Sequence, residues 1–211
     1  MKRHKLIFAV QFICLILFFS CRTTISIEGF ERLPSSHKNR HFPQKEISRS
    51  IAGRGIKSAE QLTKFFMANR PDGDRKQVKR LAKYYIEEGL TEGINSDVAF
   101  VQMCLETGFL RFGNLVTADM HNYCGLGAID AARPGERFLT EQLGVRAHIQ
   151  HLHAYGTASD VRLVNPLIDN RYKWVNPRGK AFSVFELSGT WASDPRYGLK
   201  LDELLTRLSG C

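Results

Sequence analysis

The sequence predicts a mainly α-helical single domain over residues 56–209. Two observations support this: apolar residues recur at helical spacing in five segments, and the alternation typical of strands is scarce. The chain has 211 residues, of which 43% are hydrophobic and 24% charged, which excludes a disordered chain and a multi-span membrane protein. Its five cysteines are too few for a disulfide scaffold.

The N-terminus has the layout of an export signal. Three basic residues precede an apolar run over residues 6–19, which is short for a membrane-spanning helix and is followed by Ser20 and Cys21. The ending LFFSC resembles a bacterial lipoprotein signal, although Phe18 stands where that signal prefers Leu. We therefore expect a signal peptide over residues 1–20 and a lipid on Cys21; an ordinary signal peptide or an uncleaved anchor is the alternative.

The net charge argues against a nucleic-acid partner. The chain carries +9, and cleavage removes three of its 30 basic residues and none of its 21 acidic ones, which leaves +6. The remaining basic residues are scattered without a dense run. A moderately positive exported protein suits an acidic extracytoplasmic polymer or a membrane surface.

Residues 21–55 are expected to form the lipid-attachment cysteine and a flexible tether. This stretch is polar and basic, contains prolines and serines, and shows little hydrophobic periodicity. Such a tether would reach roughly 35 Å and would let the domain act near the membrane. The alternative is an edge segment packed on the domain.

The first two helices of the domain have clear boundaries. Ser58 and Gln61 fit a capping box at the start of the first helix, which ends before the turn at Pro71. The second helix carries an apolar face from Val78 onward, and we expect it to end at Gly89.

Three more helices follow. Asn95 or Ser96 begins the third helix, and Gly108 is well placed to stop it. A glycine-bearing loop leads to a fourth helix over residues 140–155, with Thr140 as its cap. Leucines at helical spacing over residues 201–208 predict the last helix.

Glu106, at the end of the third helix, is the candidate catalytic group. The negative end of the helix dipole and the apolar neighbours Leu105 and Phe109 should raise the pKa of its carboxyl group. A carboxyl that stays protonated near neutral pH is what a glycosidase needs to protonate the leaving oxygen. Position alone, however, favours an ordinary surface glutamate in a last helical turn.

Three sequence motifs favour the catalytic interpretation of Glu106 over an ordinary surface glutamate. AFVQMCLETGFL, HNYCGLGA and GTWASDPRYGLKL, in this order, resemble the bacterial peptidoglycan endo-β-N-acetylglucosaminidases of glycoside hydrolase family 73, which include the muramidase-like domain of the flagellar rod-assembly protein. The resemblance covers roughly residues 56–208. It implies a lysozyme-like fold with a central cleft, and cleavage of the β-1,4 bond after N-acetylglucosamine. No metal or cofactor is expected.

The resemblance also implies roles for single residues. Glu106 matches the catalytic glutamate, and Tyr197 matches an aromatic residue whose hydroxyl faces the site. Flat aromatic faces bind sugar rings, and a tyrosine adds a hydrogen-bonding group; core packing is the alternative for the aromatic residues. Substrate binding is expected of the remaining motif residues, which are Gln102, Asn122, Tyr123, Gly125 and Trp191.

The region where relatives carry a second catalytic acid departs from the family pattern. Many relatives place another glutamate on a β-hairpin after the first, but the region after Gly127 contains no convincing hairpin. Asp130 and Glu136 are the candidates, since Glu141 is well explained as a partner of a helix dipole. Alternatively, the 2-acetamido group of the substrate acts as the nucleophile and no second carboxylate is needed.

The remaining reactive side chains have ordinary explanations. His148, His151 and His153 fit packed or cleft-lining histidines better than a metal cluster. Cys104 and Cys124 each lie within a motif, so they are expected to be either a disulfide or two buried thiols.

Together these observations predict an exported, lipid-anchored, monomeric hydrolase of peptidoglycan glycan strands, with Glu106 as its general acid. It would work outside the cytoplasm, in contact with a bacterial membrane through its anchor and with no nucleic acid. The alternatives are a lytic transglycosylase, an amidase-type wall hydrolase, or a non-catalytic peptidoglycan-binding assembly factor.

Overall fold

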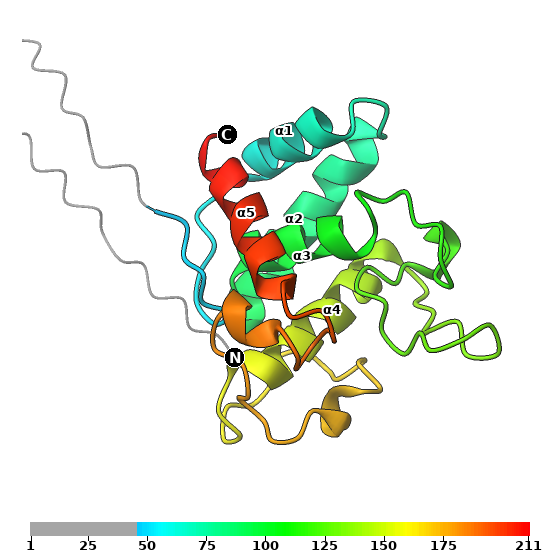
Figure 1. Ribbon diagram of the computed structural model, residues 1–211, viewed down its shortest axis with the longest axis vertical. Coiled ribbons are helices and arrows are strands. Elements are labelled where there is room, and N and C mark those ends of the chain that lie inside the picture. Colours follow the sequence, from blue (N-terminus) through cyan, green and yellow to red (C-terminus); the bar gives the residue numbers. More distant parts are fainter. Residues whose placement is uncertain (1–45) are drawn as a thin grey trace, which may run out of the picture. The chain divides into compact units, whose positions relative to one another are not determined.

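Residues 46–211 are described by the computed structural model, and they are mainly α-helical, as predicted (Figure 1). The helices are α1 (Ala59–Asn69), α2 (Arg75–Glu92), α3 (Ser96–Glu106), α4 (Glu141–Gly156) and α5 (Tyr197–Ser209), with short 3₁₀ turns η1 (Ala118–Met120), η2 (Tyr172–Trp174) and η3 (Val184–Leu187). The predicted signal peptide over 1–20, Cys21 and most of the predicted tether lie outside the described residues. Within 46–211, the helices fall short of the length and apolar character needed to cross a bilayer.

The starts of α1, α3 and α4 are set by side chains that the sequence indicated. The capping box of α1 is confirmed: the Ser58 hydroxyl accepts from the backbone N–H of Gln61, whose side chain accepts from the backbone N–H of Ser58. Asn95 caps α3 and Thr140 caps α4, each through its side-chain oxygen. These caps satisfy N–H groups that have no partner inside the helix.

The end of α2 differs from the prediction. The helix runs through Gly89 to Glu92 and ends at Gly93, whose φ of +68° is the left-handed geometry of a helix stop. Gly89 has another role, because a Cβ atom there would lie 2.7 Å from the carbonyl oxygen of Ile94. The glycine lets the chain after α2 fold back tightly against the helix.

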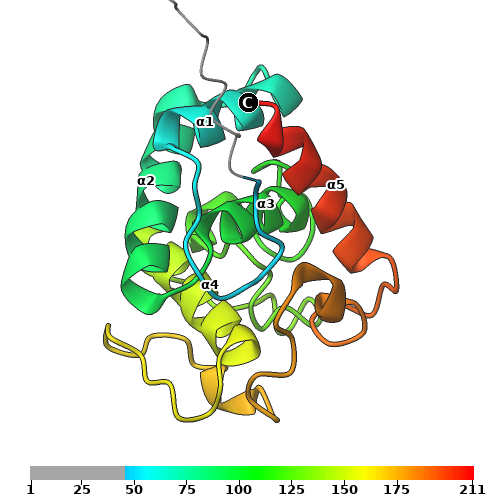
Figure 2. The same cartoon turned by 90° about the vertical axis from the view of Figure 1, so that its left-hand side faces the viewer.

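Helix α3 lies at the centre of the domain and positions the site. Figures 1 and 2 show it surrounded by the other helices, and it packs against all four of them. Its residues from Ser96 to Cys104 are all buried. Only its C-terminal end approaches the surface, at the half-buried Leu105 and Glu106. The buried part of α3 thus fixes the position of the Glu106 carboxylate at the partly exposed C-terminal end of the helix.

The segment before α1 is part of the domain, which corrects the predicted tether boundary at residue 55. Ile47 and Ile51 are buried in the core. Ile51 also donates its N–H to the carbonyl of Phe182 at 2.9 Å and accepts from the N–H of Asn95 at 2.8 Å. Two isoleucines in a polar stretch give no periodicity, so the sequence pattern did not reveal this packing.

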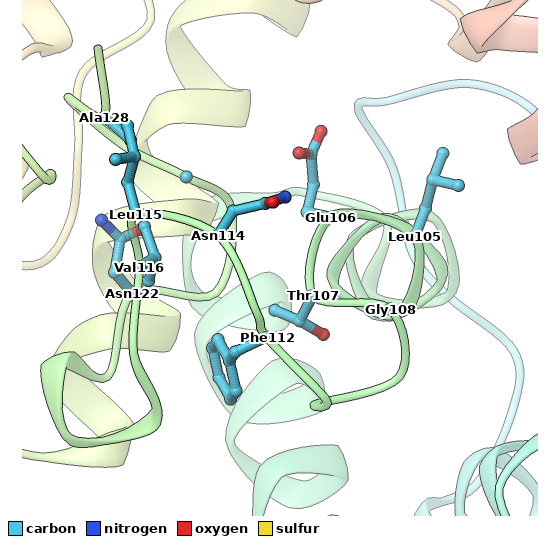
Figure 3. Close-up of a pocket in the computed structure, with 11 residues that line it drawn as sticks. Leu105, Glu106, Thr107, Gly108, Phe112, Asn114, Leu115, Val116, Asn122 and Ala128 are labelled. Atoms are coloured by element: carbon cyan, nitrogen blue, oxygen red, sulfur yellow. The ribbon is translucent and has the colours of Figure 1, made fainter. Parts of the chain in front are cut away.

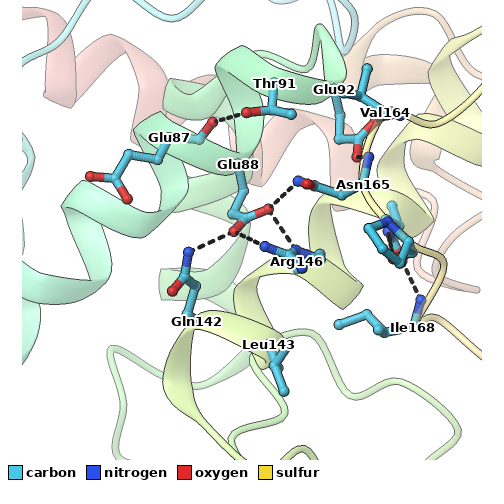
Figure 4. A network of polar contacts seen from close by, with 12 residues as sticks. Glu87, Glu88, Thr91, Glu92, Gln142, Leu143, Arg146, Val164, Asn165 and Ile168 are labelled. Atoms are coloured by element: carbon cyan, nitrogen blue, oxygen red, sulfur yellow. Dashed lines mark hydrogen bonds and ion pairs between the residues drawn. The ribbon is translucent and has the colours of Figure 1, made fainter.

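Two buried carboxylates fasten a long loop to the helices (Figure 4). Glu88 on α2 forms two 2.9 Å contacts with Arg146 on α4 and accepts from the Asn165 side chain. One turn later, Glu92 accepts the backbone N–H groups of Val164 and Asn165, each at 2.9 Å. Their partners give these acids a structural role.

Candidate active site

Glu106 lies in a cavity of about 370 Å³ beside the end of α3 (Figure 3). In Figure 3 the Asn114 side chain extends from the following loop toward Glu106. Among the described residues that line the cavity, Glu106 has the only titratable side chain. The lining consists of Leu105, Glu106, Thr107, Gly108, Phe112, Asn114, Leu115, Val116, Asn122, Gly125 and Ala128.

The two oxygens of the Glu106 carboxylate have different surroundings. Oε1 accepts a hydrogen bond from the Tyr197 hydroxyl and another, 3.0 Å long, from the Trp191 indole Nε1. Oε2 has no hydrogen-bond partner within the described part of the chain, and a Cβ at Gly125 would lie 4.0 Å from it. Because Oε1 is already occupied by two donors, a proton on this carboxyl belongs on Oε2.

Burial raises the pKa of Glu106, and the hydrogen bonds from Tyr197 and Trp191 oppose that rise. The direction agrees with the expectation from the sequence, although burial is the main cause of the shift. Such a carboxyl keeps its proton to higher pH than an exposed glutamate. It can therefore donate that proton to an oxygen of a ligand in the cavity.

Tyr197 reaches Glu106 because the start of α5 packs very closely on the turn before it. A Cβ at the neighbouring Gly198 would lie 2.6 Å from the Phe185 Cα, so only glycine fits there. Trp191 is held by ring contacts with residues of α4, including Tyr155 at 5.1 Å and His151 at 5.2 Å between centroids. The two donors to Glu106 therefore come from a well-supported C-terminal segment.

Gln102 and Tyr123 do not have the predicted substrate-binding geometry. The Gln102 side chain is fully buried, and both ends of its amide are hydrogen-bonded to other side chains. Tyr123 is 1% exposed and presents no free face to a sugar ring. This corrects the roles expected of both residues, since each supports the site from within the core.

Asn122 shapes the cavity wall through the turn that it closes. Its side-chain oxygen accepts from the backbone N–H of Leu126 at 2.9 Å, while its nitrogen donates to the carbonyls of Leu126 and Glu136. This turn contains Gly125, whose φ is +68°. Asn122 and Gly125 both line the cavity, but the amide of Asn122 is largely committed to the backbone.

Neither candidate for a second acid lines the cavity that contains Glu106. Asp130 is paired with Arg133, which lowers the pKa of the aspartate. Glu136 accepts a 3.2 Å hydrogen bond from the Asn170 side chain. The described lining of the cavity thus offers one carboxylate.

The three histidines of α4 have separate partners. His148 Nδ1 lies 2.9 Å from the hydroxyl of Tyr85, and its Nε2 contacts Gln102. His151 Nδ1 contacts the buried Asp169 at 2.8 Å. His153 Nδ1 lies 3.0 Å from the Tyr172 hydroxyl. These contacts account for all three side chains as packed residues.

The cysteines of the two motifs are free, buried thiols rather than a disulfide. Burial raises the pKa of both Cys104 and Cys124 well above the usual value for a thiol. Both are therefore uncharged near neutral pH and unsuited to act as nucleophiles.

Part of the cavity wall was not anticipated from the sequence. Phe112, Asn114, Leu115 and Val116 follow α3 in a loop without regular structure, yet they line the cavity that contains Glu106. Phe112 has a φ of +53°, a conformation that costs a non-glycine residue about 1–2 kcal/mol. The loop has no hydrophobic periodicity. The only sequence feature that could have predicted its place in the cavity wall is its position directly after Glu106.

Comparisons with known proteins add three findings. The model of the Glucosaminidase family, described as mannosyl-glycoprotein endo-beta-N-acetylglucosaminidase, matches residues 82–210. An uncharacterized protein of Borreliella burgdorferi is 37% identical over 158 residues, which are 75% of this chain and 76% of the relative. The crystal structure of S. aureus autolysin E in complex with the muropeptide NAM-L-Ala-D-iGlu has a TM-score of 0.49 and 14% identity, and the similarity covers 79% of this chain and 73% of that chain.

Proposed function

Because this chain belongs to the glucosaminidase family and is a glycoside hydrolase of the endo-β-N-acetylglucosaminidase type, we propose that it cleaves bacterial cell-wall glycan with Glu106 as general acid. The bond cut is the β-1,4 linkage after N-acetylglucosamine. The observation that carries the proposal is the state of Glu106: a half-buried carboxyl with a raised pKa, one oxygen held by two donors and the other directed to the cavity.

In this mechanism the proton on Oε2 of Glu106 passes to the glycosidic oxygen as the bond to the anomeric carbon breaks. Tyr197 and Trp191 then stabilise the carboxylate that remains, because both donate hydrogen bonds to Oε1. The carboxylate takes a proton from the attacking water in the second step. Glu106 is thereby returned to its protonated form.

The nucleophile of the first step is the 2-acetamido group of the substrate. Its carbonyl oxygen attacks the anomeric carbon, and water later opens the cyclic intermediate. This route is supported by the cavity lining, in which Glu106 has no second carboxylate beside it among the described residues. Asp130 and Glu136 remain outside the reaction in this proposal.

The N-terminal sequence supports a location outside the cytoplasm. A signal peptide would be removed, a lipid on Cys21 would hold the monomeric protein at a bacterial membrane, and the mature charge of +6 would favour an acidic wall polymer. In cells, Cys21→Ser is expected to leave the protein unprocessed or in the soluble extracytoplasmic fraction. Unchanged processing and membrane association would contradict lipidation.

Digestion of purified sacculi tests the cleavage specificity. Mass spectrometry of the soluble fragments should find glycans that end in reducing N-acetylglucosamine. Fragments ending in anhydro-muramic acid would identify a lytic transglycosylase instead, and opened stem peptides would identify an amidase. Binding without any released fragment would leave a wall-binding assembly factor.

A further inference from the structure

A continuous line of hydrogen bonds leads from the core to the Glu106 carboxylate. The Tyr197 hydroxyl bonds to Oε1 of Glu106, and Gln102 Nε2 donates to the Tyr197 hydroxyl at 2.9 Å. Behind them, His148 Nε2 lies 3.1 Å from Gln102 Oε1, and the Tyr85 hydroxyl lies 2.9 Å from His148 Nδ1. Every residue behind the carboxylate is at most 5% exposed.

The direction of these bonds is set at the buried end. Within the described residues, the Tyr85 hydroxyl has His148 as its one hydrogen-bond partner, so it donates to Nδ1. The ring proton of His148 is therefore on Nε2, where it donates to Gln102 Oε1. That bond turns the Gln102 nitrogen toward Tyr197, whose oxygen accepts and whose hydrogen goes to Glu106.

The opposite direction would disable the general acid. With the Gln102 amide turned over, Tyr197 would donate to Gln102 and its oxygen would need a proton from Oε1 of Glu106. The proton of the carboxyl would then point into the protein instead of the cavity. The hydrogen of Tyr85 would also lose its acceptor, which makes this arrangement unfavourable.

We propose that Tyr85, His148 and Gln102 are positioning residues that aim the Tyr197 hydroxyl at Oε1 of Glu106 and thereby keep the transferable proton on Oε2. The proposal rests on Glu106 being the general acid. It gives Gln102 a role other than substrate contact, and it explains why a tyrosine and a histidine are paired in the core behind the site.

The ring of His148, the hydroxyl of Tyr197 and the thiol of Cys124 are uncharged near neutral pH. Burial, with a smaller effect from His151, lowers the pKa of His148 to about 3, so the ring is neutral and has one donor and one acceptor. Burial also raises the pKa of Tyr197 and of Cys124, both of which interact electrostatically with Glu106. The basic limb of the pH profile therefore reports the titration of Glu106 itself.

The matched variants are Tyr85→Phe and Tyr172→Phe. Each removes a hydroxyl that bonds to Nδ1 of a histidine on α4, but only Tyr85 connects to Glu106 through the hydrogen bonds described. In the full chain, Tyr85→Phe should lower kcat about tenfold with KM within twofold. It should also move the basic limb to higher pH, because the carboxylate loses part of its hydrogen bonding. Tyr172→Phe should change neither quantity.

Direct titration of Glu106 by ¹³C NMR of its carboxyl group tests the proposal without using activity. Its pKa should rise in Tyr85→Phe and in Gln102→Leu, and adding Tyr85→Phe to Gln102→Leu should cause no further rise, since the line is already cut. Equal effects of Tyr85→Phe in both backgrounds, or an unchanged pKa in every variant, would overturn the proposal. If cleavage does not depend on Glu106, the proposed function fails, and the titration still decides whether these residues orient the carboxyl.

Discussion

The hydroxyl of Tyr197, at the start of α5, hydrogen-bonds to the Glu106 carboxylate at the end of α3, across 91 positions of sequence. This contact joins the C-terminal motif to the central one and engages one carboxylate oxygen. Trp191 binds the same oxygen, so the other oxygen is left for the cavity. In the proposed mechanism, this asymmetry directs the proton of the carboxyl toward the cavity.

Tyr197→Phe should reduce kcat by about ten- to a hundredfold, because a hydrogen bond to a charged group contributes about 1.5–3 kcal/mol. Without this donor the pKa of Glu106 should rise beyond the value that burial already gives. A general acid is active below its pKa and loses activity as pH rises through it. The basic limb of kcat/KM should therefore move to higher pH, and a limb that stays in place or moves down would refute this role of Tyr197.

Glu106→Gln should stabilise the fold at high pH. The folded carboxyl has a pKa raised above 4.5, so the folded state binds more protons than the unfolded state and loses stability as pH rises through this window. The amide introduced by Glu106→Gln keeps an oxygen for Tyr197 and Trp191 but cannot ionise. We expect the variant to be more stable than wild type at pH 8 and equally stable near pH 4, measured by urea unfolding. Equal stability of variant and wild type at pH 8 would contradict the raised pKa.

The starts of α1, α3 and α4 could be predicted from the sequence because their caps are local. Ser58, Asn95 and Thr140 each bond to the backbone two or three residues ahead, and that spacing is visible in the sequence. Gly89 shows where local rules fail. This glycine allows the close approach of the Ile94 backbone and does not end the helix. The packing of Ile51 was missed for a similar reason, since its contacts lie far away in the sequence.

The candidate site was predicted in part. The motifs predicted Glu106 and Tyr197 as site residues, and the two side chains are hydrogen-bonded in the structure. A motif does not show which way a side chain faces, so Gln102 was expected to touch substrate although it is buried. The pairing of Tyr85 with His148 spans 63 positions, and no spacing in the sequence reveals it.

Replacing Glu88 with Ala should destabilise the fold by about 3–5 kcal/mol, because Arg146 would lose the carboxylate with which it pairs. The loop at Asn165 would also lose one of its attachments to α2. Glu60→Ala, which breaks exposed ion pairs with Arg75 and Lys79, should change stability little. Urea unfolding measures the loss of unfolding free energy in each variant. Similar losses in Glu88→Ala and Glu60→Ala would contradict the structural role of Glu88.

Ile51→Ala should cost about 2–5 kcal/mol, as expected for a large aliphatic side chain removed from a core. Gly156 of α4 packs directly on Ile51, since a Cβ there would lie 2.5 Å from the Ile51 Cγ2. Ser50→Ala, at the exposed neighbouring position, is the control and should stay within about 0.5 kcal/mol of wild type. A flexible segment at 46–55 would instead make both substitutions neutral in thermal or urea unfolding.

The most direct test is the rate at which Glu106→Gln releases glycan fragments from purified sacculi, measured beside its binding to the same material. If Glu106 is the general acid, cleavage should fall by about 10²- to 10⁴-fold while binding stays within a few-fold of wild type. Cleavage by Glu106→Gln within tenfold of the wild-type rate would contradict the assignment of Glu106.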